Sequence, residues 1–201
     1  MSDASNRGNV RYRTIVADPP WEYEPFVSIN RTHGRTYNRR VTKPLPYPSM
    51  TLAEIRALPV GELADRDCFL WCWTTNRYLP EIFPLVSAWG FSYAQTIVWH
   101  KLKFGSPFGG SVAPNRAEYL ILARKGSPRL AGRWDGGSVV AAPGMSGRRK
   151  GFHSRKPEVF LDLIEQVSPE PRLELFARRQ RFGWDTWGNE ALEHVEVVSG
   201  L

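Results

Sequence analysis

The sequence predicts a single α/β domain built on a mostly parallel β-sheet. Short apolar runs typical of buried strands alternate along the chain with amphipathic segments typical of helices. This alternation favours strands that are joined by right-handed helical crossovers. A chain of 201 residues is long enough for one well-packed domain, and its length argues against two. We expect the domain to span residues 12–190, with flexible tails at 1–11 and 191–201.

The first predicted strand, residues 15–17, ends in a sharp turn made by Asp18, Pro19, Pro20 and Trp21. Neither proline can donate to a sheet ladder, so the strand must stop there. Ligands of open α/β sheets bind just beyond such strand ends. A carboxylate and a proline carbonyl can accept the two hydrogens of an exocyclic amine, and an indole offers a flat face to a base. The alternative is that the prolines merely end a strand and Trp21 packs at its rim.

Residues 22–46 form a long connection without apolar periodicity. Long connections in compact domains are usually functional or disordered, and this one leaves directly from Trp21. We therefore expect a flap that contacts the substrate. The candidate substrate-binding residues in and near the basic loops are Arg35, Arg39, Arg40, Tyr47 and Lys103.

The next elements also carry local signals. Thr51 and Glu54 form a capping box that predicts a helix over residues 52–58. The aromatic run 68–73 predicts a buried strand, in which Cys68 and Cys72 share one face as core thiols. Residues 74–76 can cap a second helix, which ends at Gly90.

The second half of the chain continues the alternation. Strands are predicted at residues 93–99 and 119–123, and a short edge strand at 138–142. Pro157 suits the first turn of a helix that ends near Val167, where prolines follow. Residues 173–177 predict the last strand, which breaks into a basic segment.

Composition and net charge indicate the kind of partner, the compartment and the metal content to expect. A net charge of +7 and a pI near 9.7 favour a polyanionic partner, although a solvated basic surface is the alternative. No apolar run reaches membrane-spanning length and the first residues are polar, so we expect a cytoplasmic protein with no membrane contact. The histidines are scattered and no CxxC is present, so we expect no metal.

A series of spaced motifs resembles one known family. The motifs are Asp18-Pro19-Pro20-Trp21, Tyr47-Pro48-Ser49-Met50, Phe69-Leu70-Trp71, Ile97-Val98-Trp99-His100-Lys101, His153-Ser154-Arg155-Lys156-Pro157-Glu158, Leu175-Phe176-Ala177-Arg178 and Trp187-Gly188-Asn189-Glu190. Together they resemble the adenine-N6 methyltransferases related to the catalytic subunit of the mRNA adenosine methyltransferase, which include compact bacterial and phage enzymes. The resemblance covers most of residues 14–190.

The resemblance implies a Rossmann-like, S-adenosylmethionine-dependent methyltransferase fold with helices on both faces of the sheet and a permuted motif order. It implies that Asp18 and the Pro19 carbonyl, with Pro20 completing the motif, hold the target amino group while Trp21 stacks on the adenine. The reaction is then a direct displacement that depends on in-line positioning and electrostatics, with no metal. A target in duplex DNA must first be flipped out of the stack.

The same resemblance implies the cofactor-binding residues. They are Lys101, Ser154, Lys156, Phe176, Arg178, Gln180, Asn189 and Glu190. Cations such as Lys101 and Arg178 suit the carboxylate or ribose hydroxyls of S-adenosylmethionine. The chain departs from the mRNA enzyme at Gln180 and Arg181, where that enzyme has His-Asn, and residues 115–118 match the family's Asn-x-x-Glu pattern loosely.

These observations favour an adenine-N6 methyltransferase that acts on nucleic acid, with DNA preferred over RNA. One alternative is a catalytically silent nucleic-acid-binding partner subunit, but such a subunit would not need to keep Asp18 and its prolines. Another is a methyltransferase for a protein amide, which Trp21 and the clustered arginines disfavour. The sequence leaves open the recognition sequence, the preference for single or double strands, and whether the protein forms homo- or hetero-oligomers.

Overall fold

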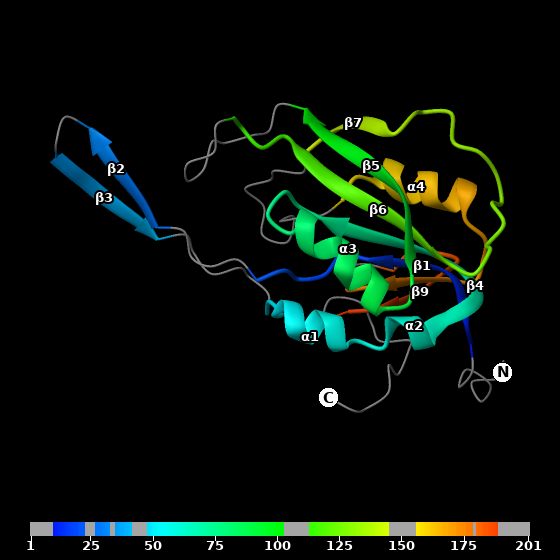
Figure 1. Ribbon diagram of the computed structural model, residues 1–201. Coiled ribbons are helices and arrows are strands. Elements are labelled where there is room, and N and C mark those ends of the chain that lie inside the picture. Colours follow the sequence, from blue (N-terminus) through cyan, green and yellow to red (C-terminus); the bar gives the residue numbers. More distant parts are fainter. Residues whose placement is uncertain are drawn as a thin grey trace.

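A seven-stranded sheet forms the centre of the molecule (Figure 1). The computed structural model describes residues 10–22, 27–32, 35–41, 48–102, 113–144, 156–178 and 180–188, and between 27 and 41 it describes the backbone alone. In chain order, the strands of this sheet are β1 (Tyr12–Ala17), β4 (Ala64–Thr74), β5 (Ser92–Leu102), β6 (Ala117–Lys125), β7 (Val139–Pro143), β8 (Arg172–Leu175) and β9 (Trp184–Trp187).

The strand order is β7-β5-β6-β4-β1-β8-β9. The β1/β4, β1/β8, β5/β7 and β8/β9 pairs are parallel, whereas β6 is antiparallel to both of its neighbours. Within this sheet six strands therefore point one way and β6 points the other. The carboxyl ends of the six strands and the amino end of β6 share one edge. The predicted mostly parallel α/β sheet is confirmed.

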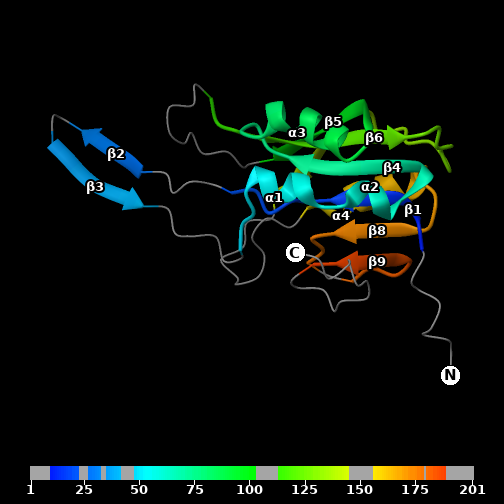
Figure 2. The same cartoon turned by 60° about the horizontal axis from the view of Figure 1, so that its bottom comes forward.

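Helices cover both faces of the sheet, as the two views in Figures 1 and 2 show. The helices α1 (Leu52–Ala57), α2 (Val60–Leu63) and α3 (Leu79–Ala88) pack on one face, and α4 (Glu158–Val167) packs on the other. Side chains of β4 alternate between the two cores, because successive residues of a strand point to opposite faces. Cys72 lies in the core under α3, and its neighbours Trp71 and Trp73 lie in the core under α4.

The thiols behave as predicted. Cys68 and Cys72 are both free, buried and on the α1–α3 side of β4. Burial raises the pKa of the Cys68 thiol to about 12, and burial likewise raises the pKa of Cys72. Both therefore act as apolar packing groups at neutral pH.

The local helix signals were correct in part. The Thr51–Glu54 capping box is present and starts α1 at Leu52. The predicted cap of the second helix at residues 74–76 is wrong, since α3 begins at Leu79 with Tyr78 at the N-cap position. The side chain of Asn76 instead bonds Asn115 and Tyr119, so it is not available to cap a helix. Pro80 in the first turn of α3 suits the later start.

Three strands were not predicted. The connection from Trp21 contains a hairpin of β2 (Val27–Thr32) and β3 (Arg35–Val41), which pair antiparallel in a sheet of their own. The third is β9, whose four residues alternate between buried and half-buried. A pattern of four residues is too short to separate from a loop by periodicity.

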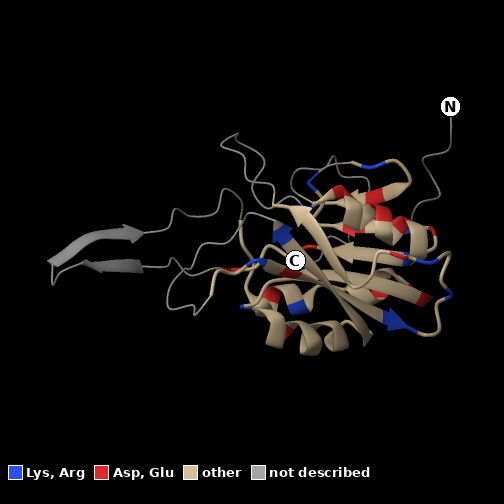
Figure 3. Ribbon diagram, turned by 90° about the horizontal axis from the view of Figure 1, so that it is seen from above, with Lys and Arg blue, Asp and Glu red and all other residues tan. Residues whose placement is uncertain are grey.

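The connection between β8 and β9 is fastened to α4 by Arg181. Its guanidinium pairs with Glu158, Asp162 and Glu165 at 3.0, 2.7 and 2.6 Å. The Trp184 indole N–H donates to the same Glu165 carboxylate at 2.7 Å. Figure 3 marks acidic residues as red bands, which are present along the helices. Arg181 is thus occupied in holding α4 against β9.

No helix in the described residues is both long enough and apolar enough to cross a bilayer.

Candidate active site

The predicted acceptor motif at Asp18 and the predicted cofactor-binding motif at Phe176 and Arg178 lie together at the carboxyl edge of the sheet. Asp18 directly follows β1, and Phe176 directly follows β8. The two strands are parallel neighbours, with Ala17 opposite Leu175. Lys101 is near the end of β5, and Glu118 is the second residue of the reversed strand β6, so both reach the same edge. Two segments about 150 residues apart in the chain are thereby brought side by side.

A chain of alternating charges runs along this edge. The Lys156 ammonium lies 3.0 Å from the Asp18 carboxylate and 3.0 Å from the Glu118 carboxylate. The Lys101 ammonium donates to the second Glu118 oxygen. All four side chains are 14–21% exposed. Because the charges are mostly withdrawn from water, the pairing governs their protonation.

The pKa values shift in the directions expected of such a cluster. Burial raises the pKa of Asp18, the charge of Glu118 adds to the rise, and Lys156 and Arg178 offset it only in part. Burial also acts to raise the pKa of Glu118, but Lys156 and Lys101 outweigh it and hold that pKa below its ordinary value. Burial acts to lower the pKa of Lys156, but the two carboxylates raise it above its usual range. Lys156 and Glu118 are therefore charged at neutral pH, and Asp18 is the group most easily protonated.

The ammonium groups of the two lysines each contact a tryptophan ring. The Lys156 ammonium lies 5.1 Å from the ring centroid of Trp73, and the Lys101 ammonium lies 4.9 Å from that of Trp99. Phe160 of α4 packs edge-on against both indoles. Cation–π contact and the rigid aromatic floor restrict where each ammonium can sit.

Two backbone hydrogen bonds fix the turn after Asp18, one within the turn and one from Met50. The Trp21 N–H donates to the Pro19 carbonyl at 2.8 Å, and the Met50 N–H donates to the Pro20 carbonyl at 2.9 Å. A carbonyl has two lone pairs, so Pro19 keeps one acceptor site for a ligand. Trp21 is 4% exposed, and Tyr78 stacks on its indole at 4.7 Å between ring centroids. Tyr78 covers one face of the Trp21 indole. Stacking of Trp21 on an adenine stays a prediction.

The loops after β8 and β9 touch through their backbones. The Ala177 N–H donates to the Trp187 carbonyl at 3.0 Å, and a Cβ at Gly188 would lie 2.6 Å from the Ala177 nitrogen and oxygen. Only glycine permits this approach. Phe176 has φ near +62°, a left-handed conformation that is rare for a bulky residue and often marks a ligand site.

The remaining predicted residues are placed as follows. Gln180 is exposed on the β8–β9 connection. Arg35, Arg39 and Arg40 lie in β3, where the backbone alone is described. The predicted residues outside the described part of the chain are Tyr47, Lys103, Ser154, Asn189 and Glu190.

Glu118 and Tyr78 were not predicted as site residues. The loose Asn-x-x-Glu match at 115–118 was the available signal for Glu118, since it places an acid at the start of an apolar strand. Nothing local in the sequence marks Tyr78, because its contact with Trp21 spans two separate elements. In the described residues, no group of three or more His, Cys, Asp and Glu side chains could hold a metal ion.

Comparison with known proteins agrees with this geometry. The sequence profile of the MT-A70 family matches residues 12–190. The chain is 28% identical over 190 residues to the type II methyltransferase M.MunI of a Mycoplasma species, covering 90% of this chain and 78% of that protein.

Eukaryotic relatives match over a smaller share of their own length. The mouse N(6)-adenine-specific methyltransferase METTL4 is 29% identical over 209 residues, which cover 94% of this chain and 40% of METTL4. The human N(6)-adenosine-methyltransferase catalytic subunit METTL3 is 26% identical over 190 residues, which cover 90% of this chain and 28% of METTL3. The family profile accounts for nearly all of the described sheet, including the strand ends that carry Asp18, Glu118 and Arg178. The chain therefore belongs to the MT-A70 family.

Proposed function

We propose that the protein is an S-adenosylmethionine-dependent methyltransferase that modifies N6 of adenine in nucleic acid. The observation that carries this proposal is the Asp18 carboxylate, which projects from a strand end beside the Pro19 carbonyl and is paired with Lys156 at 3.0 Å. Two acceptors on one rigid turn match the two hydrogens of an exocyclic amine. METTL4 and METTL3 are named as N(6)-adenine and N(6)-adenosine methyltransferases and M.MunI as a type II methyltransferase, and these names support methyl transfer to adenine.

In this mechanism Asp18 and the Pro19 carbonyl accept the two amino hydrogens, which fixes the direction of the nitrogen lone pair. S-adenosylmethionine, when bound, supplies the electrophilic methyl group. As the nitrogen becomes positively charged, the negative charge of Asp18 stabilises it, and Asp18 can then take the released proton. Burial favours that last step because it raises the pKa of Asp18. The positive charge of Lys156 favours the ionised form of Asp18, which is the form that accepts the amino hydrogens.

The residues that follow β8 and β9 support the binding of S-adenosylmethionine at this edge of the sheet. Arg178 follows β8, and its charge acts on Asp18, so it is placed to bind a carboxylate or hydroxyl beside the reacting group. Phe176 and Gly188 shape the adjoining backbone. Lys101 was predicted to bind the cofactor, and we assign it a different role. Its ammonium donates to Glu118, and Glu118 in turn positions Lys156.

We propose DNA rather than RNA as the substrate. The match to M.MunI, named as a type II methyltransferase, extends over 78% of that protein, and the basic character of the chain suits either polyanion. The silent-partner alternative is disfavoured because the Asp18–Lys156–Glu118 arrangement is intact.

The test is incubation with isotope-labelled S-adenosylmethionine and, separately, duplex DNA, single-stranded DNA and RNA, followed by nucleoside analysis. We expect labelled N6-methyladenine from DNA. Asp18→Asn should abolish it, while Asp135→Asn, the same change at an exposed position, should not. Absence of label in all three nucleic acids would overturn the proposed function, and label in RNA alone would overturn the choice of DNA.

A further inference from the structure

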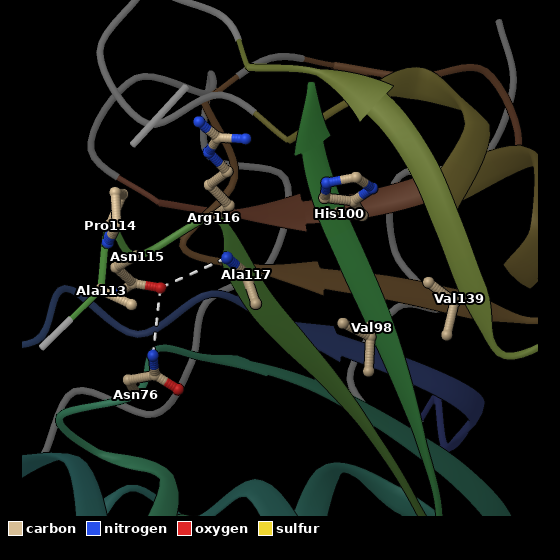
Figure 4. A pocket seen from close by; sticks show the side chains of 9 residues that line it. All are labelled: Asn76, Val98, His100, Ala113, Pro114, Asn115, Arg116, Ala117 and Val139. Atoms are coloured by element: carbon tan, nitrogen blue, oxygen red, sulfur yellow. Dashed lines mark hydrogen bonds between the residues drawn. The ribbon is translucent and has the colours of Figure 1, made fainter. Parts of the chain in front are cut away.

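A cavity of about 500 Å³ opens at the carboxyl end of β5 and the amino end of β6 (Figure 4). Its lining includes Val98 and His100 of β5, Val139 of β7 and the segment 113–117 that leads into β6. Asn76, between β4 and α3, closes one side. The volume lies within the range of small-molecule and nucleotide pockets.

The cavity and the charged cluster occupy opposite faces of the same two strands. His100 precedes Lys101 in β5, and Ala117 precedes Glu118 in β6, so in each pair one side chain faces the cavity and the next faces the cluster. The strands are joined here by the Lys101 N–H, which donates to the Arg116 carbonyl at 2.8 Å. A nucleic-acid strand that enters both the cavity and the cluster has to cross the sheet edge here, at the carboxyl end of β5 and the amino end of β6.

Hydrogen bonds fix the polar wall of the cavity. The Asn76 amide N–H donates to the Asn115 Oδ1 at 3.1 Å, and the Ala117 backbone N–H donates to the same oxygen at 3.2 Å. The Tyr119 hydroxyl donates to the Asn76 Oδ1 at 2.5 Å. Because a backbone N–H can only donate, these bonds set the orientation of the Asn115 amide and leave its NH₂ group as a donor.

The other surfaces of the cavity are apolar or carry an arginine and a histidine. Val98 and Val139 form an apolar floor, and Val139 is 61% exposed although it lies on a strand. Arg116 and His100 are exposed at the rim. An apolar floor, amide donors and an arginine are the groups that hold a base, its edge and its phosphate respectively.

We propose that this cavity binds the nucleotide that flanks the target adenine in the substrate strand. The base packs on Val98 and Val139, the Asn115 amide donates to its edge, and Arg116 pairs with its phosphate. The inference rests on the proposed function, because it assumes that the adjacent charged cluster receives an adenine. It assigns part of the sequence preference of the enzyme to residues on the α3 side of the sheet.

The test compares Arg116→Ala and Val139→Asp with Arg129→Ala, an exposed arginine on the connection between β6 and β7. Fluorescence anisotropy with single-stranded DNA oligonucleotides that contain one adenine, each with a different flanking base, gives Kd over a range of salt. We expect both cavity variants to weaken binding about fivefold or more, and Arg116→Ala to reduce the log–log salt slope by about one. Arg129→Ala should change neither, and the affinity for S-adenosylmethionine should stay the same in all three.

The second readout is kcat and KM for the same oligonucleotides. We expect both cavity variants to raise KM and to flatten the preference for one flanking base. Cavity variants that match Arg129→Ala in Kd and in flanking preference would overturn the proposal, as would a selective loss of S-adenosylmethionine binding. If the unaltered protein methylates no nucleic acid, the proposed function fails as well. Methylation that is indifferent to the cavity variants defeats this inference alone.

Discussion

Lys156 lies 3.0 Å from carboxylate oxygens of both Asp18 and Glu118, so Lys156→Met leaves two buried acids facing each other. At this distance and an effective dielectric constant of about 20, each pair corresponds to roughly 5 kcal/mol of Coulomb attraction before desolvation is subtracted. Removal of one partner from a buried pair costs about 3–5 kcal/mol net. For a chain of this size we expect Tm to fall by roughly 6–20 °C at pH 8.

The loss should depend on pH in a defined sense. The pKa of Asp18 is already raised by burial, and the variant raises it further because the lysine that opposed the rise is gone. A folded-state pKa above the unfolded value means that the folded variant takes up a proton first as the pH falls. The destabilisation should therefore shrink between pH 8 and pH 5. The acidic limb of the kcat/KM profile should move to higher pH, because the proposed mechanism requires Asp18 to be ionised.

The assay is thermal unfolding of Lys156→Met, Glu118→Gln and the double variant. Neutralising Glu118 relieves the repulsion, so the double variant should be more stable than the sum of the two single changes predicts, by about 1–3 kcal/mol. Lys125→Met is the matched control, since that lysine donates to the Gly61 carbonyl at 2.8 Å. Its effect should be smaller and insensitive to pH in this range. Additive single changes, or a loss in Lys156→Met no greater than in the control, would refute the coupling.

Three further predictions follow from the site. Asp18→Ala should abolish methyl transfer while equilibrium binding of S-adenosylmethionine, measured by calorimetry, stays within a few fold; full activity would disprove the acceptor role. Gly188→Ala places a Cβ 2.6 Å from the Ala177 backbone and should weaken binding of the methyl donor by tenfold or more, with a loss of about 1–3 kcal/mol of stability, and an unchanged Kd would show that the loops do not shape that site. Nucleic-acid affinity should fall steeply between 50 and 200 mM salt, and a flat response would remove the phosphate-contact argument.

Local chemistry explains why parts of the fold were predictable. Prolines at 19 and 20 end β1, and the Thr51–Glu54 box starts α1; in both cases neighbouring residues determine the outcome. The resemblance to the adenine-N6 methyltransferases implied that Asp18 holds the target amine and Arg178 the methyl donor, which requires their strand ends to be close. The parallel pairing of β1 with β8 places them so.

Contacts between residues that are far apart in the chain explain the features that the sequence did not predict. Glu118 belongs to the site because it pairs with Lys156, which lies 38 positions later in the chain. It reaches the site because β6 is antiparallel to its neighbours, so the start of β6 lies at the edge where the other strands end. The later start of α3 has the same cause, since Asn76 is drawn into contact with Asn115 on a distant loop. No pattern of neighbouring residues encodes either contact, so sequence periodicity could not reveal them.

The indoles beneath the two lysines give the protein an internal optical reporter. Trp73 and Trp99 each have an ammonium group about 5 Å from the ring centroid. The emission of an excited indole shifts with the electric field of a nearby charge, so a ligand that displaces Lys156 or Lys101 changes the intrinsic fluorescence. Occupancy of the site can therefore be followed in real time without a label, and replacing Trp73 or Trp99 with phenylalanine in turn identifies which lysine has moved.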